Sequence, residues 1–233
     1  MRACGFTRVC RARWQSRRGR WRGAAVRAFA SGDHGIEGAM ARTQGSRSEI
    51  TGPLIREAAL RLFARHGYAA VSMRQIAAAV GVQVGTLYAY TPDKQTLLAD
   101  LLKTHMEAVL AEWHDRPDTD ALTRLDHFVA THIAMSLDHL EEVFLAYMEL
   151  RNLSPENHAM IAGLRRRYED ALEIILIDGQ REGRMRLDDP RLAMLALIGM
   201  LTGVTNWYRA GGRLDRERLI AIYQGLARGA VGA

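Results

Sequence analysis

Polar and aromatic side chains that could read a nucleic acid are concentrated in residues 72–94, SMRQIAAAVGVQVGTLYAYTPDK. Ser72 and Gln75 have the Ser-x-x-Gln spacing of a capping box, which starts a helix by satisfying two free backbone N–H groups. Gly81 can make the turn after that helix, and a second short helix follows from Val84 to about Tyr90. This order of an alanine-rich helix, a glycine turn and a short helix is typical of the helix-turn-helix, whose second helix enters the major groove of DNA.

Two tyrosines on the second helix are the first candidates for contacts with bases. A helix this short cannot bury both Tyr88 and Tyr90 together with Leu87, so at least one tyrosine is expected to face DNA. Leu87 has a residue type that is more common in a core. Arg74 points away from the apolar side of the first helix, so it is either a solvated charge or a contact with a phosphate.

Residues for catalysis or for metal binding do not form a recognisable set. The seven histidines after residue 39 have no metal-ligand spacing, and both cysteines, Cys4 and Cys10, lie near the N-terminus. The sequence has no nucleophile beside a base, no glycine-rich phosphate loop and no paired carboxylates in an apolar setting. We therefore expect neither an enzyme nor a protein with a metal or cofactor.

The positive charge of the chain is unevenly distributed. The net charge is +6, but residues 1–39 hold 9 basic and 2 acidic side chains. Residues 40–94 hold 7 basic and 3 acidic side chains, whereas residues 95–233 hold 16 and 21. A basic segment followed by an acidic one is what a DNA-binding module attached to a domain of another function should show.

Helix signals recur along the chain after residue 50. Ala, Leu, Arg and Glu dominate, and most predicted helices begin with a cap residue and end near Gly or Pro. We predict an all-α fold of nine helices, at about residues 52–66, 72–80, 84–90, 91–114, 119–137, 140–152, 154–182, 189–209 and 215–229. Thr51 and Thr91 are predicted to cap the first and fourth of these, each with a proline in the first turn.

The N-terminal residues 1–39 show neither helical nor strand periodicity, and we expect no fixed structure there. We favour a start that is over-extended, with the true start at Met40, over a disordered basic arm or a targeting peptide. A DNA-binding domain is expected at residues 49–109, with its motif at 72–91, and a second domain at 118–233. No apolar run reaches the roughly 18 residues that span a bilayer. We therefore expect a soluble cytoplasmic protein without a membrane partner.

From about residue 49 to residue 107 the chain resembles the DNA-binding domain of the TetR family of regulators. The stretch AALRLFARHGYAAVSMRQIAAAVGVQVGTLYAYTPDKQTLL carries the resemblance. It implies that the first three helices bind DNA and that the last two, 189–209 and 215–229, form a homodimer. It also implies recognition-helix positions at Gln83, Val84, Thr86, Leu87, Tyr88 and Tyr90. Ser72 and Lys94 correspond to positions that contact phosphates at helix N-termini. Ala89 and Thr91 depart from the aromatics common in the family, and Gln83 from its usual Ser.

The C-terminal half resembles, over shorter pieces, a branch of that family that regulates fatty-acid and steroid-ring breakdown and responds to acyl-CoA thioesters. The pieces are MELRNLSPEN, RRRYEDAL, GMLTGVTNWYRAGGRL and IYQGLARG. The side chains at 144, 147, 148 and 151 share one helix face, which is either plain core or an adaptable apolar pocket. Residues 165–167 are three arginines, either a solvated face or a site for the nucleotide phosphates. Trp207 and Arg209 either close the dimer interface or line the mouth of the pocket. Expected ligand-binding residues are Phe144, Tyr147, Met148, Arg151, Arg166, Trp207 and Arg209.

The function that these expectations favour is a ligand-responsive transcriptional repressor. A homodimer would bind a pseudo-palindromic operator of double-stranded DNA in the bacterial cytoplasm, at the nucleoid. A small hydrophobic effector, such as an acyl-CoA thioester, would enter a pocket enclosed by the helices between residues 119 and 209. The helix at 91–114 would transmit the change. The alternative is a helical, dimeric interaction or architectural protein without sequence-specific DNA binding.

Overall fold

The computed structural model describes the backbone of residues 44–233 and the side chains of residues 50–233. Within that part the fold is all-α, as predicted, with nine α-helices, two short 3-10 helices and no strand. The expectations for residues 1–39, including Cys4 and Cys10, lie outside the described residues. No helix in the described part is long and apolar enough to cross a membrane.

The first three helices form a small unit whose buried side chains belong to one core that continues into the rest of the described chain. They are α2 (Gln44–His66), α3 (Met73–Val80) and α4 (Val84–Tyr88). Fully buried side chains from each helix meet in this unit: Ile55, Ala59, Phe63, Ile76 and Leu87. Because α4 is a helix of 5 residues, its place depends on this core rather than on its own helix propensity.

The start of α2 differs from the prediction. The helix begins at Gln44, so Thr51 is not its cap and Pro53 lies inside it. Proline in a helix removes one backbone hydrogen bond, but it does not force the helix to begin there when neighbouring turns continue. The predicted start at about residue 52 is therefore wrong, because the helix begins at Gln44 and passes through Pro53.

The helix-turn-helix itself agrees with the prediction. The Ser72 side chain accepts from the Gln75 N–H, and the Gln75 side chain accepts from the Ser72 N–H, which completes the capping box. Gly81 follows with a φ of 77°, a left-handed conformation that glycine adopts without steric cost. The next helix, α5 (Lys94–Glu112), is capped by Asp93. The prediction of a Thr91 cap is wrong, because Thr91 is buried and its hydroxyl donates to the Asp93 carbonyl at 3.1 Å.

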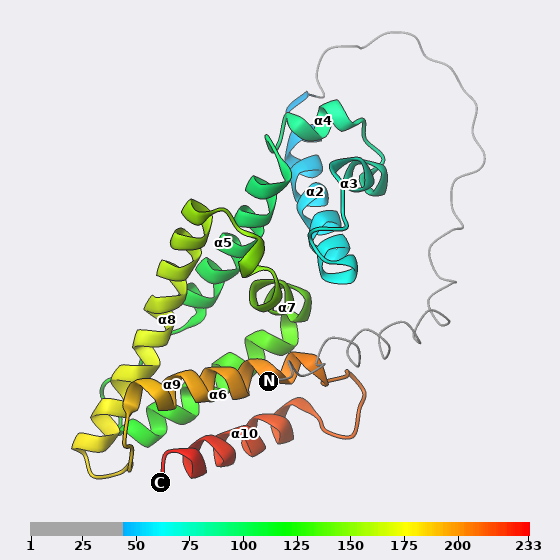
Figure 1. Cartoon of the computed structure of the whole chain (residues 1–233). Helices are drawn as coiled ribbons and strands as arrows, with labels where there is room; N and C mark the ends of the chain where they lie inside the picture. The colour runs from blue at the N-terminus through cyan, green and yellow to red at the C-terminus, as the bar shows by residue number, and fades with distance from the viewer. Residues whose placement is uncertain (1–43) are drawn as a thin grey trace, which may run out of the picture. The chain divides into compact units, whose positions relative to one another are not determined.

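The remaining helices form the larger part of the molecule (Figure 1). They are α6 (Ala121–Asp138), α7 (Leu140–Met148), α8 (Pro155–Arg181), α9 (Pro190–Thr202) and α10 (Arg216–Ala230). Helix α8 packs on α5, α6 and α9, and α10 packs on α6. Large side chains from α6, α8, α9 and α10 fill the common core, among them Phe128, Leu172, Leu201 and Tyr223. Two predicted helices end early and continue as 3-10 turns, Leu150–Asn152 and Gly203–Asn206.

A buried arginine ties the end of α5 to α6 and α8. The Arg124 guanidinium donates to both Asp115 oxygens, at 2.9 and 2.7 Å, and to Asp178 at 2.8 Å. These hydrogen bonds hold the pKa of Asp115 below its usual range. Buried charges are stable only when they are paired and hydrogen-bonded. This group therefore holds the segment that follows α5 against α6 and α8.

Candidate nucleic-acid interface and internal cavity

The exposed side of the helix-turn-helix carries most of the residues predicted to contact DNA. Gln83, Thr86, Tyr88 and Tyr90 are exposed, and Val84 is half-buried. Tyr88 is 50% exposed, so its ring is available to a partner. The Tyr90 ring lies against α2, where a Cβ added at Gly52 would come within 3.6 Å of it. Leu87 is a correction, because it is fully buried and its side chain belongs to the core of this unit.

The N-terminal end of α3 opens into a shallow hollow suited to an anion. Ser72, Arg74, Tyr88 and Lys94 line it together with residues 69–71 and Met73. The capping box occupies the N–H groups of Ser72 and Gln75. The N–H groups of Met73 and Arg74, at the positive end of the helix dipole, have no partner within the helix. With Arg74 exposed beside them, these groups can hold a phosphate.

Lys94, which was predicted to contact a phosphate, uses most of its hydrogen-bonding capacity within the protein. Its ammonium donates to the carbonyls of Tyr68 and Val71, at 3.0 and 2.8 Å. It also lies over the Tyr68 ring, 4.2 Å from the ring centre. Two of its three N–H groups are therefore occupied within the protein, where the side chain holds the loop before α3, and Lys94 also lines the hollow.

A cluster of four polar residues, here called the clamp, joins that same loop to the end of α7. Its members are Tyr68, Gln95, Glu149 and Asn152. Glu149 is buried and accepts the Tyr68 backbone N–H at 3.1 Å and the Asn152 side-chain amide. Gln95 on α5 donates to the Asn152 carbonyl at 2.8 Å and accepts the Ser154 N–H at 3.1 Å. The clamp thus links α5 and the loop before α3 to the segment between α7 and α8.

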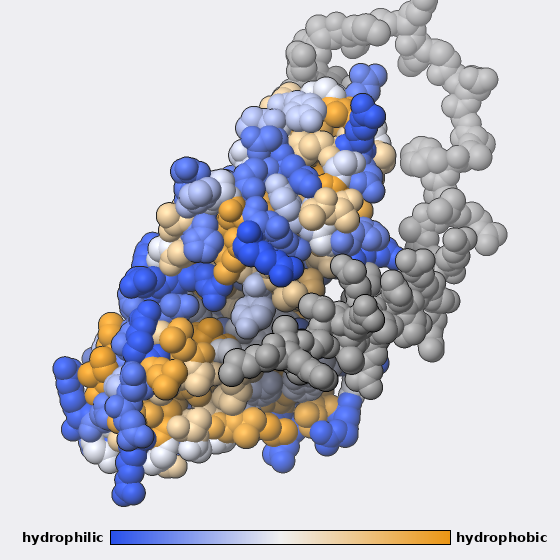
Figure 2. Space-filling view, viewed as in Figure 1, coloured by the Kyte–Doolittle hydropathy of each residue, from blue (hydrophilic) through white to orange (hydrophobic). Residues whose placement is uncertain are grey.

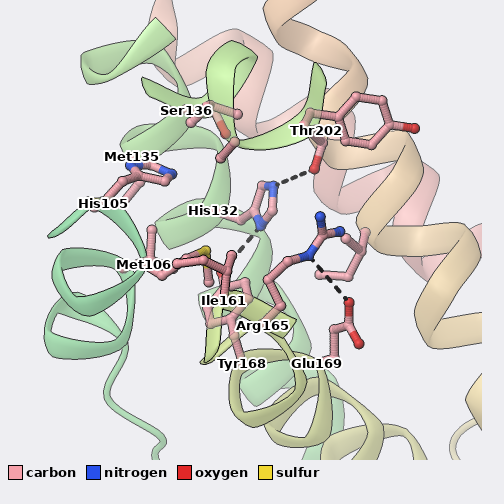
Figure 3. Close-up of a pocket in the computed structure, with 15 residues that line it drawn as sticks. His105, Met106, His132, Met135, Ser136, Ile161, Arg165, Tyr168, Glu169 and Thr202 are labelled. Atoms are coloured by element: carbon pink, nitrogen blue, oxygen red, sulfur yellow. Dashed lines mark hydrogen bonds and ion pairs between the residues drawn. The ribbon is translucent and has the colours of Figure 1, made fainter. Parts of the chain in front are cut away.

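A cavity of about 80 Å³, partly open to solvent, lies among five helices, α5 to α9. The sequence predicted a pocket enclosed by the helices between residues 119 and 209, which are α6 to α9. Helix α5 is an additional wall, through His105, Met106 and Val109. Half of the other twelve wall residues are apolar. They are Met135, Val143, Ala146, Tyr147, Ile161 and Ile198, with the polar His132, Ser136, Arg165, Tyr168, Glu169 and Thr202 among them (Figure 3).

The histidines of the cavity wall are neutral at physiological pH. Burial lowers the pKa of His132 to about 4, and its ring nitrogens lie 3.2 Å from the Tyr168 hydroxyl and 3.4 Å from the Thr202 hydroxyl. Burial likewise lowers the pKa of His105 to about 4, although Glu142 opposes the shift. Burial raises the pKa of the Tyr168 hydroxyl. The cavity is therefore an apolar space with uncharged polar groups, and its charged residues are Arg165 and Glu169, which pair at 3.9 Å.

Only one of the seven predicted ligand-binding residues lines this cavity. That residue is Tyr147. Phe144 is half-buried outside the lining, and five residues are exposed away from it: Met148, Arg151, Arg166, Trp207 and Arg209. Helix α7, which ends at Met148, lines the cavity with Val143, Ala146 and Tyr147. Helix α8 lines it with Arg165 rather than with the predicted Arg166.

Helices α5 and α6 line the cavity, although none of the predicted ligand-binding residues lies on them. His105 and His132 are the clearest of the residues that these helices supply, since each lies on the apolar side of its helix. That position was a usable signal, because a histidine among buried apolar residues needs a polar partner. In the described part no group of three His, Cys, Asp or Glu residues could hold a metal ion.

An exposed apolar surface covers the outer side of α9 and α10. Leu192, Leu195 and Leu226 are 63%, 47% and 51% exposed. Figure 2 shows hydrophobic side chains gathered over the end of the molecule where α8, α9 and α10 lie. The exposed Gly199 and Gly225 lie on the same two helices, and glycine allows close approach of another helix.

The sequence matches two family descriptions. Residues 55–101 match "Bacterial regulatory proteins, tetR family", and residues 118–231 match "Tetracyclin repressor-like, C-terminal domain". The chain is 27% identical over 196 residues to the transcriptional repressor KstR2 of Mycobacterium tuberculosis, which covers 82% of this chain and 98% of that protein.

Solved structures agree with these matches. A tetR-family regulatory protein from Rhodococcus RHA1 superposes with a TM-score of 0.74 at 30% identity, covering 78% of this chain and 97% of that one. AibR, solved in complex with isovaleryl coenzyme A and operator DNA, superposes with a TM-score of 0.70 at 25% identity. That match covers 76% of this chain and 97% of AibR.

Proposed function

We propose that this chain, which belongs to the TetR family of bacterial regulatory proteins, is a transcriptional repressor that leaves its operator when a small apolar effector enters the cavity. The family is one of DNA-binding transcriptional regulators rather than enzymes. Its relative KstR2 is named as a repressor, which favours repression over activation. Such a protein acts at the nucleoid in the cytoplasm.

The DNA contacts that we propose lie on the exposed side of α4 and at the start of α3. Gln83, Thr86 and Tyr88 would reach base edges, with Val84 and Tyr90 at the border of the contact. The N-terminus of α3, with Ser72 and Arg74, would hold a backbone phosphate. Lys94 would act indirectly by bracing the loop that leads into α3.

A homodimer through α9 and α10 is the arrangement that best covers the exposed apolar surface. Leu192, Leu195 and Leu226 would then be buried against the same residues of a second copy, as a two-fold axis requires. Two α4 helices would lie in successive major grooves about 34 Å apart, on a pseudo-palindromic operator. Trp207 and Arg209 would lie near this interface rather than in the cavity.

An acyl-CoA thioester is the effector class that we propose. The apolar wall of the cavity suits an acyl group, and AibR, a regulator of similar fold, was solved with isovaleryl coenzyme A. The large, charged coenzyme would remain outside. Arg165 lies in the wall, and the next two arginines, Arg166 and Arg167, are exposed on α8, where they could neutralise its phosphates.

The observation that carries the proposal is the double role of α5. The first residue of this helix, Lys94, is hydrogen-bonded to the loop before α3, in the DNA-binding unit formed by α2, α3 and α4. Near its middle the same helix lines the cavity through His105 and Met106. A ligand that fits a different position of α5 would favour a different position of the DNA-binding unit. The ligand can shift the equilibrium between the two positions only by the difference between its binding free energies for the two states.

The test is a titration of the full chain with DNA from its own upstream region, with and without a panel of acyl-CoA thioesters. We expect specific binding that one or more thioesters reverse, whereas free CoA and free carboxylic acids have less effect. Specific binding that no thioester weakens would remove the effector class. Equal affinity for unrelated DNA would instead favour an architectural, sequence-independent dimer.

A further inference from the structure

Two buried polar side chains in the cavity wall make no hydrogen bond within the described part of the protein. They are His105 on α5 and Ser136 on α6, which are 8% and 2% exposed. No fully enclosed side-chain nitrogen or oxygen in the described residues lacks a partner. The polar atoms of His105 and Ser136 are therefore still reachable, and the surface they share is the cavity.

The other polar residues of the wall are occupied. His132 uses its two ring nitrogens with Tyr168 and Thr202, at 3.2 and 3.4 Å. Arg165 and Glu169 pair with each other. In Figure 3, His105 and Ser136 are drawn on the other side of His132 from this ion pair. The free hydrogen-bonding capacity of the cavity is thus concentrated between α5 and α6, away from its charged residues.

The chemistry of these two side chains selects an uncharged ligand atom. A buried polar group without a partner is unfavourable, so a water or a ligand atom is needed there. A neutral imidazole has one N–H donor and one acceptor nitrogen, and a hydroxyl donates and accepts. An ionised carboxylate placed at this end would be surrounded by Met106, Met135 and similar apolar groups, without a cation to pair with it.

We propose that the cavity binds a compact apolar group that carries one uncharged oxygen, such as a carbonyl oxygen, and that His105 and Ser136 hold this oxygen. The inference rests on the proposed effector role of the cavity and adds its polar chemistry. The volume of about 80 Å³ has room for about three water molecules at about 30 Å³ each, which limits the enclosed part of the ligand to a short chain. Because His105 belongs to α5, the ligand oxygen is bound directly to the helix that leads to the DNA-binding unit.

Three small probes of similar size test this chemistry on the full chain by saturation-transfer NMR titration. 4-Methyl-2-pentanone carries a neutral carbonyl, 3-methylbutanoate carries a carboxylate on a matching skeleton, and benzene carries no oxygen. We expect the ketone to bind at least about tenfold more tightly than the carboxylate, because burying an unpaired charge is costly.

Two variants locate the oxygen. His105→Leu and Ser136→Ala each remove a hydrogen-bonding group with little change of shape, and each should weaken ketone binding about tenfold while changing benzene binding by less than about twofold. His158→Gln, at an exposed histidine outside the wall, is the matched control. Thermal melting of each variant shows whether it is folded, and His105→Gln, which keeps an N–H donor, should restore part of the ketone affinity.

The inference is overturned if the ketone does not bind, if both variants bind it as tightly as the wild type, or if the carboxylate binds more tightly. Failure of the proposed function would look different. It would show as a lack of sequence preference in DNA binding by the wild type and all variants, measured without probes and independent of the NMR titrations.

Discussion

The Glu149 carboxylate at the end of α7 accepts a hydrogen bond from the backbone N–H of Tyr68 at 3.1 Å, across 81 positions of the chain. Tyr68 belongs to the loop that leads into α3, and α7 lines the cavity through Val143, Ala146 and Tyr147. A single buried carboxylate therefore connects the wall of the cavity with the approach to the DNA-binding helices. This contact gives α7 a route to the DNA-binding unit in addition to α5.

Replacing Glu149 with Ala should separate ligand binding from DNA release. The variant leaves the Tyr68 N–H and the Asn152 amide without their acceptor, so we expect a loss of about 1–3 kcal/mol in the free energy of unfolding. Probe binding in the cavity should persist, while the ligand-induced change in DNA affinity should shrink. Glu142→Ala, which alters a partly exposed carboxylate on the same helix, is the control. Full ligand-induced release by the Glu149 variant would exclude the clamp from the coupling.

Neighbouring residues on α4 should respond in opposite ways to truncation. Tyr88→Ala should abolish specific DNA binding and change stability by no more than about 0.5 kcal/mol, because Tyr88 is half exposed. Leu87→Ala should cost about 2–5 kcal/mol of stability, because Leu87 is fully buried. Urea denaturation measures the stability of both variants, and DNA titration measures their affinity for the operator. A Tyr88 variant that unfolds as readily as the Leu87 variant would make Tyr88 a structural residue.

A charge on the outer side of α9 should prevent dimerisation. Leu195→Glu places an unpaired carboxylate where we propose that two copies meet, and sedimentation should show a monomer where the wild type is a dimer. Glu107→Gln, on the exposed side of α5, is the matched control for a surface change elsewhere. A Leu195 variant that remains dimeric would place the interface on another surface.

Stability should fall as the pH is lowered from about 6.5 toward 4. His105 and His132 have a pKa of about 4 in the folded chain because burial disfavours their charged form, against about 6.5 when unfolded. In this window the unfolded chain binds protons that the folded chain does not, so the free energy of unfolding drops by up to about 1.4 kcal/mol per pH unit for each histidine. Above pH 7 neither histidine contributes to the pH dependence.

Urea denaturation between pH 7 and pH 5 measures this slope before most carboxylates titrate. His132→Gln and His105→Gln should each make the slope shallower, and replacing the exposed His158 with Gln is the matched control. An unchanged slope in the two cavity variants would show that these histidines do not set the pH dependence.

Local signals in the sequence were sufficient for most of the fold. The Ser72–Gln75 capping box and the turn at Gly81 appear as predicted. The helix starts predicted at 154, 189 and 215 are confirmed as well, with Ser154, Asp189 and Asp215 as caps. These features depend on neighbours a few residues apart, which the sequence displays directly. The errors at Thr51 and Thr91 arose where a proline was taken to mark a first helical turn.

The cavity could not be derived in the same way. Its wall combines side chains from five helices, and which face of each helix turns inward depends on packing that periodicity alone does not give. Leu87 and Lys94 show the same limit at the DNA-binding unit. Their alignment with family positions suggested contacts with DNA, whereas burial of Leu87 and the carbonyls near Lys94 determine where their side chains lie.

The most direct measurement is the affinity of the full chain for a duplex from its own upstream region, compared with a scrambled duplex of equal composition, at about 150 mM salt. Fluorescence anisotropy should give a preference of at least about 10³-fold for the upstream duplex, and the acyl-CoA that binds in the cavity should reduce it. Equal affinity for the two duplexes, with the same dependence on salt, would contradict the proposal that this protein is a sequence-specific repressor.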